Sequence, residues 1–237
     1  MLSSRINKKI GQAMSDYSML SDGDHVLVAV SGGIDSLALT YLLKEWQKKA
    51  PITYHLHVVH IDMNIWEKSM GGVNPVIDVQ SQMKKTGLPL HVEKSLPFPE
   101  AERNCFSCSK LRRKLLFDLA SRFKCNKIAF GHHKDDLLET LFINMFYSGN
   151  ISTMVPAQQL FDGRLTVIRP LAYLEKRDVE KIAEDAGLKA VSNLCPLSGD
   201  TKREEVQKML ENIYKQIPGA KASLFASMKN VREGYML

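Results

Sequence analysis

The chain has 237 residues, of which 44% are hydrophobic and 24% are charged, as in an ordinary globular protein of one or two domains. It lacks both an apolar stretch near the ~18 residues of a membrane span and the apolar block of a secretory signal, so we expect a cytoplasmic protein with no membrane partner. The formal net charge of +6 suits a polyanionic partner such as nucleic acid, but it is equally compatible with a plain solubility preference.

Strand-like and helix-like segments alternate along the chain. Short apolar or β-branched runs predict strands, and apolar side chains at helical spacing predict helices. In chain order we expect a helix within 1–20, strand His25–Val30, helix Ser36–Lys49, strand Ile52–Ile61, helix Pro75–Lys85, strand Pro89–Glu93, helix Ser109–Lys124, strand Lys127–Phe130, helix Asp135–Tyr147, strand Thr166–Ile168, and helices Glu175–Ala186, Lys202–Gln216 and Ala222–Val231. This alternation predicts an α/β fold with a parallel sheet covered by helices on both faces.

We expect one central α/β domain over residues 21–190. The N-terminal helix at 1–20 precedes it, and a C-terminal helical segment at 191–237 follows. No linker rich in Pro, Gly or Ser divides the chain, and no internal repeat is visible. Because ligands of parallel sheets bind beyond the carboxyl ends of the strands, motifs at those ends are the candidates for a functional site.

A glycine-rich turn follows the first predicted strand and reads Ser31-Gly32-Gly33-Ile34-Asp35-Ser36. Its two glycines permit positive φ and a close backbone approach to a ligand, and the N–H groups at the next helix start point at an anion. Asp35 would repel phosphate unless a divalent cation lay between them, so the turn suits pyrophosphate with Mg²⁺. A plain tight turn with a capping residue is the alternative, but the whole string after a buried strand favours binding.

A second polar string follows the fourth predicted strand and reads Gly131-His132-His133-Lys134-Asp135-Asp136. Either carboxylate could help to hold Mg²⁺, and Asp135 could instead cap the next helix. His132 and Lys134 could meet phosphate charge. For each residue alone, an ordinary loop is a competing interpretation. Asp62 ends the second predicted strand, where it is either a turn former or, in this fold, a neighbour of adenine and ribose.

Four cysteines occur, and three of them form a pattern. Cys105 and Cys108 are a C-x-x-C pair that leads into a basic helix, and Cys195 lies far along the chain. Three thiolates would leave one iron of a 4Fe-4S cluster open for a ligand such as hydrosulfide. A Cys₃His zinc site and a redox pair are alternatives, although a redox pair leaves Cys195 unexplained. Cys125, near a strand start, fits a packed small residue better than a ligand.

Taken together, the glycine turn and the G-H-H-x-D-D string resemble the PP-loop ATP pyrophosphatases, a Rossmann-like, HUP-type superfamily that cleaves ATP to AMP and pyrophosphate. The cysteines narrow the resemblance to the tRNA 2-thiocytidine synthetases over most of the chain. Further matching strings are Leu141–Tyr147, Ile168–Tyr173, Asn193–Cys195 and the ending from Ile217 to Val231.

This resemblance implies an ATP-dependent tRNA sulfurtransferase. It adenylates the C2 oxygen of an anticodon-loop cytidine and replaces that oxygen with sulfur delivered through a 4Fe-4S cluster. The implied metal ligands are Cys105, Cys108 and Cys195, and these with Asp35 are the implied catalytic residues. The implied residues for ATP and Mg²⁺ are Ser31, Gly32, Gly33, Asp35, Ser36, Asp62, Gly131, His132 and Asp136. The implied partners are tRNA and a cysteine desulfurase or other sulfide donor, with a homodimer possible.

The basic helix after the C-x-x-C pair carries candidates for tRNA phosphate contacts, although a solvated helix face explains each of them equally well. These candidates are Lys110, Arg112, Arg113 and Lys114. Phe106 is either a base-stacking or a core aromatic residue. Ile34 replaces the lysine that is typical of the family, so that phosphate contact is either lost or supplied by Lys134.

Several rival functions remain open at this point. A PP-loop enzyme could transfer sulfur to another nucleotide or to a small molecule, and a zinc-stabilised nucleotide- or RNA-binding module would need no catalysis. A tRNA-Ile lysidine synthetase shares the glycine turn but would not need the three cysteines.

Overall fold

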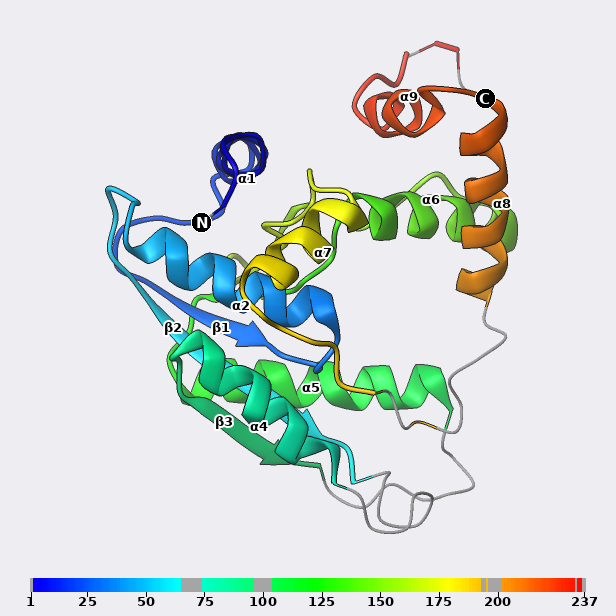
Figure 1. Ribbon diagram of the computed structural model, residues 1–237. Coiled ribbons are helices and arrows are strands. Elements are labelled where there is room, and N and C mark those ends of the chain that lie inside the picture. The colour runs from blue at the N-terminus through cyan, green and yellow to red at the C-terminus, as the bar shows by residue number, and fades with distance from the viewer. Residues whose placement is uncertain are drawn as a thin grey trace. The chain divides into compact units, whose positions relative to one another are not determined.

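The computed structural model describes residues 2–64, 74–95, 104–192, 195, 202–232 and 234–235 (Figure 1). Its described helices are α1 (Ser4–Asp16), α2 (Ile34–Gln47), α4 (Pro75–Thr86), α5 (Cys105–Arg122), α6 (Lys134–Ser148), α7 (Lys176–Asp185), α8 (Lys202–Gln216) and α9 (Ala220–Ser227). Its described strands are β1 (Asp24–Ala29), β2 (Tyr54–Asp62), β3 (Leu90–Lys94), β4 (Lys127–Ala129), β5 (Ala157–Leu160) and β6 (Leu165–Ile168). Every element expected from the sequence has a counterpart, and β5 is additional.

The chain forms two compact units. The first comprises Met1–His133 and Val155–Ser198, and the second comprises Lys134–Met154 and Gly199–Leu237. Helix α6 therefore groups with α8 and α9, whereas all six strands belong to the first unit. The domain boundaries expected at residues 20 and 190 stay predictions.

The first unit contains a six-stranded sheet in the order β3-β2-β1-β4-β6-β5. All neighbouring strands are parallel except β5 and β6, which pair as an antiparallel hairpin. The expected parallel α/β fold is thus confirmed. From β1 the chain continues toward β2 on one side, and β4 lies on the other, so the order reverses between β1 and β4. Such a switch point is where parallel α/β sheets bind ligands.

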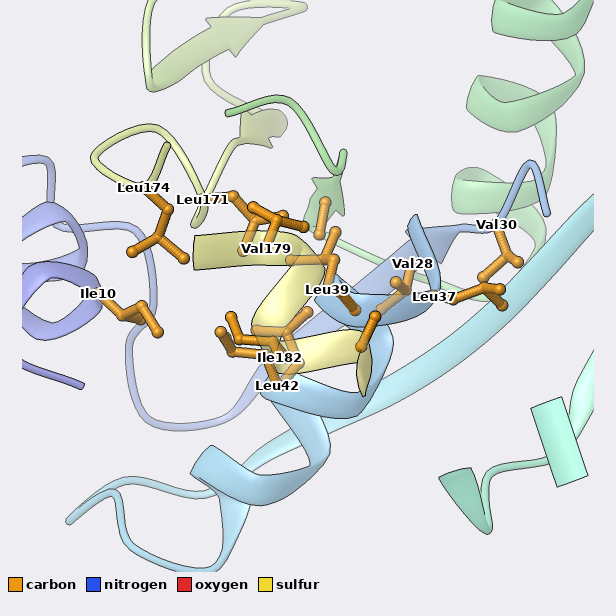
Figure 2. Packing of buried hydrophobic residues seen from close by; sticks show 14 of the residues in the cluster. Ile10, Val28, Val30, Leu37, Leu39, Leu42, Leu171, Leu174, Val179 and Ile182 are labelled. Atoms are coloured by element: carbon orange, nitrogen blue, oxygen red, sulfur yellow. The ribbon is translucent and has the colours of Figure 1, made fainter. Parts of the chain in front are cut away.

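The part of β1 from Val26 to Ala29 is continuously apolar, as expected for a strand that is covered on both faces. Val26 and Val28 face one core, where Figure 2 shows Leu37, Leu39 and Leu42 of α2 and Ile182 of α7 packed together with neighbouring apolar residues. Leu27 faces the opposite core, which α5 covers with Leu116 and Leu119. The two layers of helices therefore hold the sheet rigidly beneath the loops at its carboxyl edge.

Two expected boundaries were wrong. Helix α5 begins at Cys105, not at Ser109, because Asn104 and Ser107 form a reciprocal capping box four residues earlier. Helix α9 ends at Ser227, well before Val231. The C-x-x-C pair consequently lies inside the first turn of a helix instead of in a loop that leads to one.

The second unit has its own small core, in which Leu138 of α6 packs with Val206 and Leu210 of α8. Within the described ranges, no helix combines the length and the apolar character that crossing a membrane requires.

Cys125 is buried in the core beneath α5, as expected for a packed small residue. Burial raises the pKa of its thiol to about 11, which leaves it uncharged and unreactive at neutral pH.

Candidate functional site

The glycine turn lies directly beyond β1 and is anchored through Val30. The Val30 N–H donates to the carbonyl of Val59 at 2.8 Å, which extends the pairing with β2 past the end of β1. The Val30 carbonyl lies 2.8 Å from Nδ1 of His60, a side chain that is itself buried. Both the N–H and the carbonyl of Val30 are therefore held by residues of β2, and the turn starts from this fixed position.

Two serine hydroxyls brace the turn from within. Ser36 Oγ donates to the Gly33 carbonyl at 2.8 Å and lies 3.3 Å from Ser31 Oγ. The Gly33 N–H in turn donates to Ser31 Oγ at 3.2 Å. The two serines thus close the turn on itself. Both hydroxyls are engaged in shaping the loop, a use that their assignment to ATP binding did not anticipate.

Position 32 requires a glycine because of its backbone conformation and because of the side chains packed around it. Its φ is +94°, and an added Cβ would lie 3.0 Å from Val79 Cγ2 and 3.3 Å from Val191 Cβ. The Gly32 carbonyl also accepts a hydrogen bond from the Val191 N–H at 2.9 Å. The segment after α7 is therefore joined directly to the glycine turn.

The loop after β4 packs tightly on the start of α2. An added Cβ on Gly131 would lie 2.8 Å from the backbone carbon and oxygen of Asp35 and 2.9 Å from the Ser36 nitrogen. Two residues further along, the side chain of His133 is buried, and its Nε2 lies 3.7 Å from Asp35 Oδ1. The structure thus brings together the two motifs that the sequence analysis singled out separately.

Helix α2 begins with the N–H groups of its first turn unused by any side-chain cap, and its N-cap is Gly33. Such a helix start attracts anions through its free N–H groups and dipole. Asp35 lies in this first turn with its side chain 37% exposed. A carboxylate at the mouth of an anion site is the donor that Mg²⁺ prefers when it bridges to phosphate, so the residues present fit a magnesium–nucleotide unit.

Burial lowers the pKa of His60, although its hydrogen bond to Val30 and the charge of Asp62 act in the opposite direction. The folded protein therefore favours neutral His60, and the unfolded chain takes up a proton first as the pH falls. We expect the free energy of unfolding to decrease below about pH 6.5, and the decrease to be smaller in His60→Asn. Urea unfolding across a pH series measures this, with His55→Asn, an exposed histidine on the same strand, as control. An identical pH dependence in His60→Asn and the wild type would contradict this.

Asp62 ends β2 as expected and is buried. Its Oδ1 accepts a hydrogen bond from the Asn64 N–H at 2.9 Å, the geometry of a side chain that forms a turn. This contact supplies the structural role that was the alternative for this residue. A contact to nucleotide stays a prediction.

The C-x-x-C pair lies at the same edge of the sheet as the glycine turn. Helix α5 is the crossover between the parallel strands β3 and β4, so its first turn lies beyond the strands' carboxyl ends. Cys105 is exposed and Cys108 is half-buried in that turn.

Cys195 is connected to the same place through Val191. The Val191 N–H is hydrogen-bonded to the Gly32 carbonyl. Cys195 follows Val191 by four residues, so its Cα lies no more than about 14 Å from the Cα of Val191. Within the described ranges, no three His, Cys, Asp or Glu side chains are grouped so as to hold a metal ion. The three-cysteine ligand set therefore stays a prediction, and its Asn193 and Leu194 neighbours lie outside the described residues.

The remaining residues of the second motif belong to the second unit, at the start of α6. The helix begins at Lys134, so Asp135 lies in its first turn and does not occupy the N-cap position expected for it. Asp135 accepts from Lys221 Nζ at 2.5 Å, and Asp136 pairs with Arg203 at 3.1 Å. Lys134 Nζ lies 4.8 Å from the centre of the Phe225 ring. The predicted roles of Asp136 in Mg²⁺ binding and of Lys134 in phosphate binding stay predictions.

The candidate tRNA contacts lie along α5. Lys110, Arg112, Arg113 and Lys114 are all exposed. Phe106, between the two cysteines, is 79% exposed, so its interpretation as a core aromatic residue was wrong. The sequence analysis missed His60 and Val191, since their roles come from hydrogen bonds to segments distant along the chain.

The parallel sheet, the braced glycine turn after β1 and the open start of α2 define a PP-loop nucleotide-binding fold. A family model described as the PP-loop domain matches residues 2–210. The solved U34-tRNA thiolase NcsA from Methanococcus maripaludis, with its 4Fe-4S cluster, shares this fold at a TM-score of 0.75 and 23% identity, over 98% of this chain and 80% of that one.

Two relatives specify the family further. The tRNA-cytidine(32) 2-sulfurtransferase of Burkholderia ambifaria is 36% identical over 98% of this chain and 70% of its own length. That of Geotalea uraniireducens is 33% identical over the whole of this chain and 95% of its own length. The chain belongs to the tRNA-cytidine(32) 2-sulfurtransferase family of PP-loop proteins. The family resemblance stated from the motifs is thereby confirmed.

Proposed function

We propose that this protein catalyses the ATP-dependent replacement of the C2 oxygen of a tRNA anticodon-loop cytidine by sulfur, which forms 2-thiocytidine, AMP and pyrophosphate. The observation that carries the proposal is the hydrogen bond from Val191 to Gly32, because it tethers Cys195 to the nucleotide loop. The crossover helix α5 brings Cys105 and Cys108 to the same edge of the sheet. Family membership supports the tRNA substrate.

The donor set fits a 4Fe-4S cluster. Two thiols stand three residues apart in one helical turn, and the third, Cys195, would come from a separate segment of the chain. The thiolase of similar fold carries such a cluster, which supports the same cofactor here. When bound by three thiolates, the cluster would supply one open iron position for hydrosulfide.

The chain's own residues would act mainly on ATP. The N–H groups at the start of α2 would bind the β- and γ-phosphates that leave as pyrophosphate, and Asp35 would hold Mg²⁺, which would offset the phosphate charge. Attack of the cytidine C2 oxygen on the α-phosphorus forms the adenylated base and breaks the bond to pyrophosphate. Adenylation makes AMP the leaving group, so the nucleophilic sulfur displaces it. The exposed cations of α5 bind tRNA phosphates, and the fixed loop orients the reacting groups.

A reconstitution experiment tests this function. Anaerobically purified protein should contain iron and labile sulfide and should convert unmodified tRNA, ATP and sulfide into 2-thiocytidine, detected by nucleoside mass spectrometry, with one AMP released for each. Zinc without iron and no AMP would identify a nucleotide- or RNA-binding module instead. AMP release without a thiolated nucleoside would identify another sulfur acceptor, and either result would reject the assignment.

A further inference from the structure

Arg169, the residue directly after β6, is a buried guanidinium, with only 7% of the residue exposed. Strand β6 pairs with β4 through Ala129 and Ile168, and the Phe130 N–H donates to the Ile168 carbonyl at 3.0 Å. Arg169 therefore lies at the carboxyl edge of the sheet, beside the loop that packs on the start of α2.

The side chain faces the same side of the sheet as α5. Leu165 of β6 packs in the core beneath α5, and Arg169 follows it by an even number of residues. The charge that acts on Arg169 comes from Arg113 of α5, which agrees with this placement. Arg169 and the helix that carries Cys105 and Cys108 thus share one corner of the first unit.

The charge of Arg169 is not compensated within the described part of the chain. Its Nη1 donates to the Val155 carbonyl at 2.5 Å. Its Nε is buried and has no hydrogen-bond partner among the described residues, and no described carboxylate pairs with its side chain. Burial, followed by the like charge of Arg113, lowers the pKa of Arg169 to about 10.

Such an arrangement is unfavourable without a ligand. A buried cation without an opposite charge is costly, and a second cation nearby adds repulsion. The Nε–Nη2 edge of a guanidinium matches two oxygens of a phosphate group in bidentate geometry. In Arg169 this edge makes no hydrogen bond to any described residue, because its one side-chain hydrogen bond uses Nη1.

We propose that Arg169, assisted by Arg113, forms an anion site that binds a phosphate group of the substrates through the Nε–Nη2 edge. The role of the site in catalysis depends on the proposed function. Two sources share this chemistry: the α-phosphate of ATP, which becomes AMP, and a backbone phosphate of the tRNA. Arg169 would position that group against the reacting base.

Two binding measurements distinguish the sources. We expect Arg169→Gln to weaken one ligand about 10-fold, as is typical for loss of a charge-assisted hydrogen bond. Titration calorimetry with ATP and Mg²⁺ tests the nucleotide. Filter binding of tRNA over a salt series tests the RNA, where the slope of log affinity against log salt should fall in magnitude by about 1. Arg169→Lys keeps the charge but not the fork, so it should recover only part of the affinity.

Thermal unfolding separates an anion site from a structural role. Without ligand, Arg169→Gln should melt at the same or a higher temperature than the wild type, because an uncompensated buried charge is gone. Arg122→Gln is the control, since Arg122 lies on the same helix as Arg113 but pairs with Glu93 at 2.6 Å. Arg113→Gln is a second variant at an exposed position, and it should weaken the same ligand as Arg169→Gln.

Unchanged affinities for both ligands in Arg169→Gln and Arg113→Gln would overturn the anion site. If the melting temperature of Arg169→Gln were then also lowered, the role of Arg169 would be structural, through its hydrogen bond to the Val155 carbonyl. If the wild-type protein forms no 2-thiocytidine, but Arg169→Gln still weakens the binding of ATP or tRNA, the proposed function is rejected and the anion site is kept.

Discussion

Replacement of Cys195 by alanine is expected to remove the iron of the reconstituted protein and to lower 2-thiocytidine formation at least about 100-fold, since even an outer-shell partner of a metal site typically accounts for 10–100-fold. Cys105→Ala and Cys108→Ala should do the same, because each removes one of three ligands. ATP affinity should be nearly unchanged, since the glycine turn is braced by Ser31 and Ser36 and not by a thiol. Iron content, nucleoside mass spectrometry and nucleotide titration measure the three effects.

Cys125→Ala is the matched control for the cysteine variants. Cys125 is buried in the core beneath α5, so its replacement removes a thiol without touching the proposed ligand set. Iron content and thiolation should stay at wild-type levels in this variant. A Cys195→Ala protein that retains full iron and activity would remove the third ligand and with it the proposed cluster.

Gly131→Ala should disable ATP use without removing a single functional group. The added methyl group would lie 2.8 Å from the backbone of Asp35, so the loop after β4 and the start of α2 must move apart. A displacement near 1 Å at a reacting centre costs about 100-fold in rate, and we expect kcat/KM for ATP to fall by that order. Steady-state AMP release and the Kd for ATP measure the effect.

The control for this variant is Gly11→Ala in α1. There the added Cβ would meet only the far edge of the Trp46 ring, at 3.3 Å, and alanine favours the helix. This variant should bind ATP and release AMP as the wild type does. Wild-type ATP affinity and turnover in Gly131→Ala would show that the contact with Asp35 does not shape the nucleotide site.

Local patterns in the sequence were enough to predict the framework of the site. The apolar run of β1, the glycine turn and the spacing of α2 all follow from rules that act over a few residues. The sequence also placed both polar motifs after strands of one parallel sheet, where ligands of such sheets bind. The close contact of Gly131 with Asp35 is a finding of the structure that goes beyond this expectation.

Features that depend on distant contacts were beyond the reach of sequence patterns. Strand β5 reads Ala-Gln-Gln-Leu, which has no clear strand signal, and it forms because it pairs with β6 across the turn at Phe161. The start of α5 was misplaced because the capping box formed by Asn104 and Ser107 uses an uncommon pair of residues. Arg169 is part of a matching family string, but its burial without a paired carboxylate among the described residues emerges only from the packing of β6 beneath α5.

The central claim is that three thiols hold a cluster with one open iron beside the nucleotide loop. Mössbauer spectroscopy of the full chain, reconstituted anaerobically with ⁵⁷Fe, tests it most directly. We predict a 4Fe-4S spectrum in which one iron in four differs from the others and changes its parameters when hydrosulfide is added. Four equivalent irons that do not respond to hydrosulfide, or a protein that takes up only zinc, would contradict the account.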